Sequence, residues 1–165
     1  MQRLLIVAIV AASACVDDPA PETFGDPTTD PQLPPRGSTD LLDWIAAGHY
    51  LAWSCEAAPH PARPGSGHGP NRICSNTVLA TAAPGDGPFP VGAAAVKEVF
   101  DDTGAIRVYA VYRKVEAAPG GDSWYWFEGD RDHNFANGQG DGTCTGCHAA
   151  APRDYVYTVV PPVAP

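Results

Sequence analysis

The 165-residue chain has few basic residues, no visible internal repeat and no long apolar run, and each absence excludes a class of protein. Ten Lys and Arg stand against 19 Asp and Glu, so the net charge of −9 is too acidic for a nucleic-acid binder. The apolar run over residues 4–12 is too short to span a bilayer. Methionine occurs once, as Met1, and lysine twice, as Lys97 and Lys114. The five cysteines carry more information than these scarce residues.

The first fourteen residues have the pattern of an export signal, with Arg3, an apolar segment and the small pair Ser13-Ala14 before Cys15. Small residues directly before a cysteine resemble a bacterial lipoprotein signal, in which Cys15 becomes the acylated first residue of the mature protein. An ordinary signal cleaved near Ala14, which would leave Cys15 free, stays open. In either case the mature protein is expected to face the periplasm or the exterior. Val16 is not the aspartate that favours inner-membrane retention, so an outer-membrane anchor is favoured.

Residues 15–37 are expected to form a tether between this signal and a folded domain. They are rich in proline, which stiffens a chain, and in carboxylates, which repel one another. The remaining segment, residues 38–165, is the size of one domain.

The segment Cys144-Thr145-Gly146-Cys147-His148 has the C-x-x-C-H spacing that attaches a c-type haem. Two thiols bond to the haem vinyl groups, and the adjoining His148 is the expected proximal ligand of the iron. A redox dithiol would not need the histidine, and a zinc ribbon would need a second Cys/His pair that the sequence lacks. The sequence therefore predicts haem c.

The second axial ligand of this haem cannot be methionine, because the only methionine lies within the export signal. Either the iron takes a second histidine, from His49, His60, His68 or His133, or one face stays open. An open face would bind small ligands and permit chemistry on them.

If Cys15 carries the lipid and Cys144 and Cys147 carry the haem, Cys55 and Cys74 are the two cysteines left without a role. In an oxidising compartment such a pair predicts a disulfide, which would close a Pro- and Gly-rich loop and stabilise the fold by roughly 3 kcal/mol. A redox-active role is less compatible with two cysteines so far apart in sequence.

The expected fold class is α+β: a predominantly antiparallel sheet with an N-terminal helix and haem packed on one sheet face. Ser38 or Thr39 is the predicted cap of a helix ending near Gly48. Residues 101–104 and 119–122 predict turns. Strands are expected over residues 71–79, 91–100, 106–115, 123–128 and 155–160, which are rich in β-branched and aromatic side chains.

The order of several motifs resembles the cytochrome P-460 family, which includes the cytochromes c′-beta. The resemblance covers most of residues 41–161. It depends on Asn71-Arg72-Ile73, on Phe89-Pro90-Val91-Gly92-Ala93-Ala94-Ala95-Val96-Lys97-Glu98, on Trp124-Tyr125-Trp126, and on the late haem motif followed by Asp154-Tyr155-Val156-Tyr157-Thr158. It implies a mainly antiparallel sheet with haem against one face. In cytochrome P-460 the matching lysine is covalently joined to the porphyrin and the enzyme oxidises hydroxylamine. In c′-beta members the link is missing and the iron binds gases such as nitric oxide.

The resemblance implies that Lys97 is the cross-linking lysine and that Arg72 lines the distal face. Independently, period-2 alternation places Lys97 on the face of Ala93 and Ala95, with Glu98 on the other. His68 is a candidate distal residue. The candidates for a catalytic base are His68, Glu98, Glu128 and Asp141.

Three functions are compatible with these residues. The first is a haem oxidoreductase acting on hydroxylamine or a related small nitrogen compound, with Lys97, Arg72 and His68 as its catalytic residues and a redox partner protein. The second is a c′-beta-like nitric oxide binding protein, and the third is a bis-His electron-transfer cytochrome. A homodimer is compatible with each of them.

Overall fold

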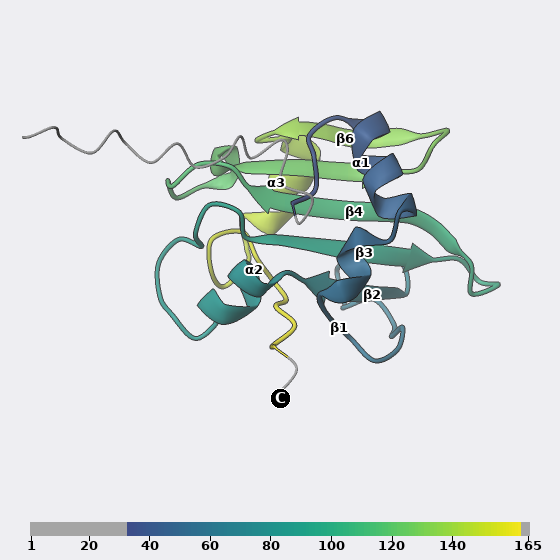
Figure 1. Ribbon diagram of the computed structural model, residues 1–165, viewed down its shortest axis with the longest axis horizontal. Coiled ribbons are helices and arrows are strands. Elements are labelled where there is room, and N and C mark those ends of the chain that lie inside the picture. Colours follow the sequence, from purple (N-terminus) through teal and green to yellow (C-terminus); the bar gives the residue numbers. More distant parts are fainter. Residues whose placement is uncertain (1–32, 163–165) are drawn as a thin grey trace, which may run out of the picture.

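The structure is a computed structural model and describes residues 33–162. The expected signal peptide, Cys15 and most of the tether lie outside these residues. Six strands form one antiparallel sheet in which each strand pairs with the next along the chain (Figure 1). The strands are β1 (Ser54–Cys55), β2 (Asn71–Ser75), β3 (Ala94–Phe100), β4 (Ile106–Lys114), β5 (Trp124–Gly129) and β6 (Asn134–Gln139). The helices are α1 (Ser38–Ala46), α2 (Thr77–Ala82) and α3 (Gly142–His148), with 3-10 turns at His49–Ala52 and Gly121–Ser123. The molecule is therefore of the α+β class.

Helix α1 crosses one face of the sheet, and α3 lies behind the other face (Figure 1). Leu41, Leu42, Trp44 and Ile45 are the buried stripe of α1. They pack against sheet residues that include Val96, Val111 and Phe127. Full burial of one such side chain stabilises by about 1.5–3 kcal/mol, so this stripe is what holds α1 in place.

The start of α1 differs from the prediction in its cap. Gly37, with φ +97°, stands at the N-cap and supplies no side chain. Its N–H instead donates to Tyr125 Oη at 3.0 Å, so a tyrosine from β5 takes up this backbone group. Neither Ser38 nor Thr39 precedes the helix, because both fall at its start or within its first turn.

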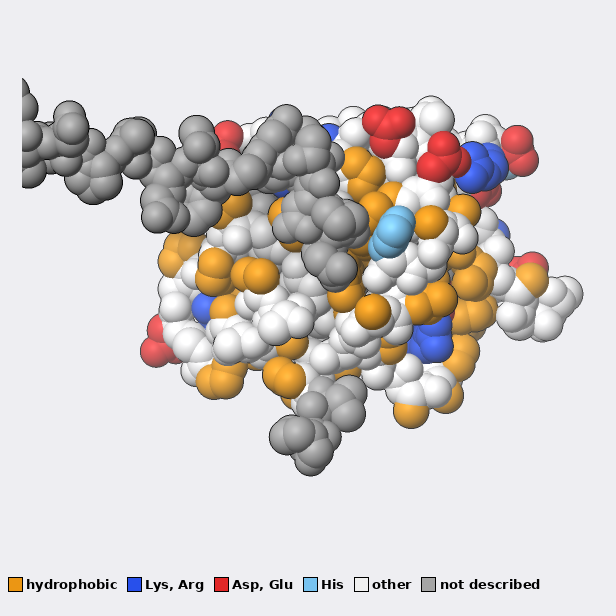
Figure 2. Space-filling model, in the orientation of Figure 1, with side chains coloured by type: hydrophobic (Ala, Val, Ile, Leu, Met, Phe, Trp, Pro, Cys, Tyr) orange, Lys and Arg blue, Asp and Glu red, His pale blue; other side chains and the backbone are white. Residues whose placement is uncertain are grey.

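On the α1 side of the molecule, charged side chains gather near the start of α1 and the β5–β6 turn (Figure 2). Within residues 33–162, no helix combines the length and apolar character that crossing a bilayer requires.

The two predicted turns are present. Asp101 joins β3 to β4, and its Oδ1 accepts hydrogen bonds from the N–H groups of Thr103 and Ala105. Gly104 adopts φ +83°, which a residue without Cβ takes without strain. The second turn leads through Gly121–Ser123 into β5.

Two strand predictions are wrong in part. Strand β2 ends at Ser75, and α2 follows where extended chain was expected, because Asn76 Oδ1 accepts a hydrogen bond from Leu79 N–H and caps that helix. Residues 155–160 join no strand of the sheet. They cross its α3 face, where Val160 N–H donates to Ser75 Oγ and Thr158 O accepts from Tyr112 Oη.

The disulfide prediction is confirmed. Cys55 and Cys74 face each other across the β1–β2 ladder and are bonded. The bond closes the loop between β1 and β2, which contains His68. On the chain-entropy model, a loop of this size gives roughly 3 kcal/mol of stabilisation.

Candidate functional site

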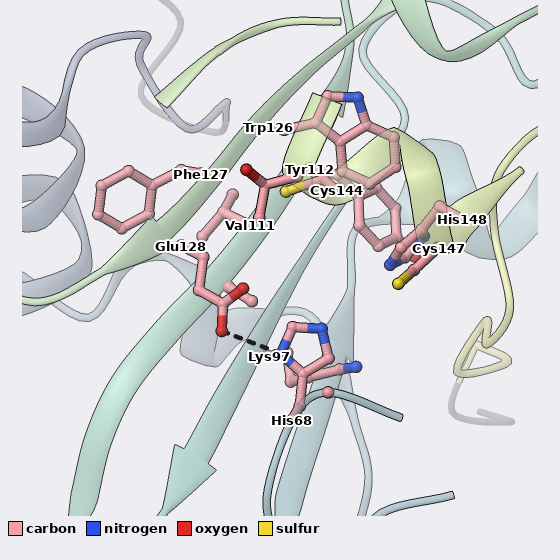
Figure 3. Close-up of a pocket in the computed structure, with 13 residues that line it drawn as sticks. His68, Lys97, Val111, Tyr112, Trp126, Phe127, Glu128, Cys144, Cys147 and His148 are labelled. Carbon is pink, nitrogen blue, oxygen red and sulfur yellow. Dashed lines mark ion pairs between the residues drawn. The ribbon is translucent and has the colours of Figure 1, made fainter. Parts of the chain in front are cut away.

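A cavity of about 260 Å³ lies on the sheet face opposite α1, between the sheet, α3 and the β1–β2 loop (Figure 3). The residues that line it are Gly67, His68, Lys97, Ala110, Val111, Tyr112, Trp126, Phe127, Glu128, Thr143, Cys144, Cys147 and His148. Most are apolar or aromatic, and the ionisable ones converge from separate segments. This combination is typical of a cofactor or ligand site.

Four cavity residues belong to α3: Thr143 and the three residues Cys144, Cys147 and His148, called the thiol–histidine motif below. Asp141 caps this short helix, since its Oδ1 accepts a hydrogen bond from Thr143 N–H at 2.9 Å. Both thiols are free, and the helical i, i+3 spacing turns them toward the same side. Burial raises the pKa of the Cys144 thiol to about 12. A redox-active cysteine needs a lowered pKa, so the site does not resemble a redox dithiol.

His148 is held by one hydrogen bond and by aromatic rings. Its Nδ1 lies 2.7 Å from Tyr155 O, and its ring meets Trp126 edge-on at 4.8 Å between centroids. Burial lowers the pKa of His148 to about 4, against the opposing effect of the Tyr155 carbonyl. The ring is therefore neutral at pH 7, donates its Nδ1 proton to Tyr155 and keeps a lone pair on Nε2. This is the form in which histidine binds a metal.

Lys97 lines the same cavity from β3. Ile73 and Ala110 are its neighbours on the adjacent strands, and Ala95 precedes it on the same face. Burial lowers the pKa of Lys97 to about 8, and nearby Arg63 lowers it further, while Glu128 and Glu56 oppose the change. The predicted alternation is confirmed, because Val96 belongs to the core under α1 and Ala95 to the core on the α3 face.

His68 and Glu128 complete the polar part of the cavity. His68 Nδ1 lies 3.2 Å from Glu128 Oε1, an ion-pair distance without the geometry of a hydrogen bond (Figure 3). His68 lowers the pKa of the Glu128 carboxyl by more than burial raises it. Lys97, His68 and Glu128, the polar group below, bring an amine, an imidazole and a carboxylate to one side of the cavity in Figure 3.

Arg72 does not reach the cavity, and the prediction that it lines the distal face is wrong. Strand β2 places Arg72 opposite Glu98 on the α1 face, where Nε and Nη2 donate to the carboxylate at 2.7 and 2.8 Å. Tyr50 Oη also donates to Glu98, at 2.6 Å, and burial raises the pKa of Tyr50. Ile73, one residue later, shares the face of Lys97.

The structure also separates the candidate bases. Glu98 is engaged with Arg72 on the far face, and Asp141 caps α3. Glu128 and His68 remain, both in the cavity. Of the candidate axial histidines, His49 lies against Trp44, His60 against Glu56, and His133 beside Phe135. Among the described residues, His68 is therefore the one candidate that shares the cavity with His148.

Arg63 was missed by the sequence analysis. Its guanidinium lies 3.9 Å from the centroid of the Tyr157 ring, and it borders a smaller cavity together with Lys97 and His148. A single arginine in a Pro- and Gly-rich loop gives no sequence signal that would place it there.

The donor set fits a c-type haem: two free thiols, a neutral histidine with one available nitrogen, and an apolar, aromatic surface for a flat ring. No model of a known protein family matches the chain, and no curated protein matches it significantly.

Proposed function

We propose that this chain is an extracytoplasmic c-type cytochrome, similar to the cytochrome P-460 family, that oxidises hydroxylamine or a related small nitrogen compound. The observation that best supports the proposal is that the thiol–histidine motif and the polar group line one cavity, although they come from α3, β3, β5 and a loop. A simple electron carrier has no need of an amine, an imidazole and a carboxylate at its cofactor.

Cys144 and Cys147 would hold the haem through thioether bonds, and His148 would bind its iron through Nε2. Trp126 and Tyr112 would pack against the ring, since both rings border His148 on the sheet face. The bound haem would supply an iron that takes electrons from the substrate and passes them to a redox partner protein.

Glu128 would take up the protons that hydroxylamine loses on oxidation. Its lowered pKa keeps it ionised at neutral pH, so it can accept a proton, and His68 at 3.2 Å can pass that proton toward solvent. The pair would also orient the N–H and O–H groups of a small substrate by hydrogen bonding.

Lys97 would form a covalent link to the haem ring. With a pKa of about 8, part of the amine is neutral and nucleophilic at pH 7. Replacing a ring C–H bond with a C–N bond removes two electrons and two protons, so a two-electron oxidant such as hydrogen peroxide is required. A linked ring would be distorted, which is one way in which a protein tunes haem electronics.

Two measurements test the proposal. Steady-state oxidation of hydroxylamine by the haem-loaded protein, with an artificial electron acceptor, should depend on Lys97, and Lys97→Ala should weaken it. Mass spectrometry of a digest should find the Lys97 peptide joined to the haem peptide that carries Cys144 and Cys147.

The alternatives give different results in the same experiments. Haem on the cysteine peptide alone, no hydroxylamine turnover and tight nitric oxide binding would favour a c′-beta-like gas-binding protein. A low-spin ferric spectrum that becomes high-spin on His68→Ala would favour a bis-His electron carrier, since His68 is the described candidate in the cavity.

A further inference from the structure

Lys114, at the end of β4, has a fully buried side chain and takes no part in the cavity. Its Nζ lies 2.8 and 3.1 Å from the two carboxylate oxygens of Asp154, whose side chain is 4% exposed. It also donates to Ser123 Oγ at 2.6 Å and Ala118 O at 2.7 Å. A buried ion pair with this many contacts costs much to disrupt from one side, but it is weak evidence for stability alone. We therefore ask which backbone segment this ion pair holds in place.

Asp154 and Tyr155 form the centre of a strained backbone turn. Their φ angles are +41° and +67°, and they are the two non-glycine residues with positive φ in the described chain. Val156 N–H donates to Arg153 O at 2.8 Å, which closes a four-residue turn. Positive φ at both central residues is the pattern of a type I′ turn, which asparagine, aspartate and glycine favour and a bulky tyrosine does not. Such a conformation persists only where its surroundings fix it.

Two side-chain contacts of Asp154 fix the turn. One is the Lys114 ammonium, and the other is Phe89 N–H, which donates to Asp154 Oδ2 at 2.8 Å. The turn is thus tied to the end of β4 and to the segment that precedes β3.

The carbonyl presented by this turn is the one that binds His148. Tyr155 O, in the centre of the turn, accepts the hydrogen bond from His148 Nδ1 at 2.7 Å. The direction of that carbonyl depends on the backbone angles of Asp154 and Tyr155, so whatever holds the turn also sets the orientation of the His148 ring.

We propose that the buried Lys114–Asp154 pair positions the proximal ligand of the haem, by locking the turn whose Tyr155 carbonyl orients His148. The inference depends on the proposed haem attachment and adds two positioning residues to it. A strong hydrogen bond from Nδ1–H makes histidine a better donor to iron and stabilises the ferric state. Loosening the turn should therefore raise the reduction potential of the haem.

The test uses the haem-loaded full chain with two double variants that remove both charges together. Lys114→Met with Asp154→Asn keeps an acceptor for Phe89 N–H and a residue that tolerates positive φ, so it is expected to fold. Lys114→Met with Asp154→Ala also removes that acceptor. The midpoint potential should rise in the first variant and rise further in the second, and the Fe–His stretching band of the ferrous protein should move to lower frequency in the same order.

The matched control is Arg72→Met with Glu98→Gln, which neutralises the ion pair between a partly exposed arginine and a buried glutamate on the opposite sheet face. It should lower stability and leave the midpoint potential unchanged. If the second variant does not load haem, the shift of the first variant alone decides. A haem-loaded Lys114→Met/Asp154→Asn protein with the wild-type potential and Fe–His band would overturn the inference. Wild-type protein without covalent haem would instead overturn the proposed function.

Discussion

Lys114 is fully buried and Lys97 is partly buried, and their surroundings suit them to different roles. Lys114 is paired with Asp154 and surrounded by acceptors, which keeps its charge neutralised inside the protein. Lys97 lies among small apolar side chains, and burial lowers its pKa to about 8. The first environment suits a structural cation, and the second suits an amine that reacts.

Glu128→Gln tests the proposed proton acceptor. The amide cannot take up a proton, so hydroxylamine oxidation should fall by about 10²-fold or more, the usual contribution of a general base. Haem loading and the ferric spectrum should change little, because within residues 33–162 the side chain of Glu128 pairs with His68 and forms no hydrogen bond with the thiol–histidine motif. Steady-state kinetics beside an absorption spectrum measure both quantities.

The pH dependence of the rate follows from the same carboxylate. Because the pKa of Glu128 is lowered from 4.5, its base form persists through pH 5, so the loss of rate caused by protonation of Glu128 should begin only below pH 4.5, after correction for protonation of hydroxylamine itself. The lowered pKa also means that Glu128 stabilises the fold above pH 4.5 and that this contribution is lost as the pH falls. Glu116→Gln, an exposed carboxylate outside the cavity, is the control and should leave the profile unchanged. An unchanged rate in Glu128→Gln would remove this residue from the mechanism.

The individual residues of the site could be predicted where chemistry dictates spacing. The C-x-x-C-H spacing singled out Cys144, Cys147 and His148, which line the cavity, and the alternation of β3 placed Lys97 on the correct face. The predicted position of Arg72 was wrong because the register of β2 pairs Arg72 with Glu98, on the face opposite the cavity. A shift of one residue along a strand moves a side chain to the other face of the sheet. Nothing local in the sequence reveals that register.

At the scale of elements, the close approach of α3 to the sheet depends on one glycine. A Cβ at Gly121 would lie 2.5 Å from Thr145 Cγ2 in α3 and 2.9 Å from Tyr155 Cε1. Gly121 O also accepts the hydrogen bond of Trp126 Nε1 at 3.1 Å. The 3-10 turn before β5 thus sets how near the thiol–histidine motif can come to Trp126.

Gly121→Ala should push α3 away from the sheet. Overpacking of this kind costs about 1–3 kcal/mol, and thermal unfolding of the haem-loaded protein measures it. Gly142→Ala, in α3 with nothing within 4 Å of the added Cβ, is the matched control and should keep or slightly raise stability. Adding Thr145→Ser to Gly121→Ala removes the nearest clashing methyl and should restore part of the loss. Equal stability of the two alanine variants would contradict this account of α3.

Elements were predictable where side-chain pattern and pairing agree. The stripe of α1 and the central strands β3, β4 and β5 have regular apolar periodicity, and all four appear near the predicted positions. Strand β6, Asn134–Gln139, was missed because asparagine and glycine disfavour strands, and it forms through backbone pairing to β5. Residues 155–160 have the composition of a strand. Their backbone groups form hydrogen bonds with the side chains of Tyr112 and Ser75 on the α3 face of the sheet, and they do not pair with an edge strand.

At the scale of the whole molecule, the sheet separates two cores. One lies under α1 and is structural, and the other lies on the α3 face and contains Cys144 among its partly buried members. The disulfide closes the loop that brings His68 to the second side. The cavity thus gathers residues from the β1–β2 loop, β3, β4, β5 and α3.

Cys15→Ser should separate anchoring from function. Loss of the acylated cysteine should release the domain from membranes, while haem loading and hydroxylamine oxidation stay at wild-type levels. Metabolic labelling with palmitate and fractionation of the producing bacterium measure the first effect. Continued labelling of the Cys15→Ser protein would show that the lipid is attached to another residue and would contradict the prediction.

Covalent haem is the central claim, and the intact mass of protein exported by a host with a c-type haem assembly system tests it most directly. The protein should be heavier than its processed polypeptide by one haem, keep that mass after extraction with acidified organic solvent, and lack it in the Cys144→Ala/Cys147→Ala/Lys97→Ala variant, which has none of the three proposed attachment points. A bare polypeptide mass for the wild-type protein, from a host that loads another c-type cytochrome in parallel, would contradict the account.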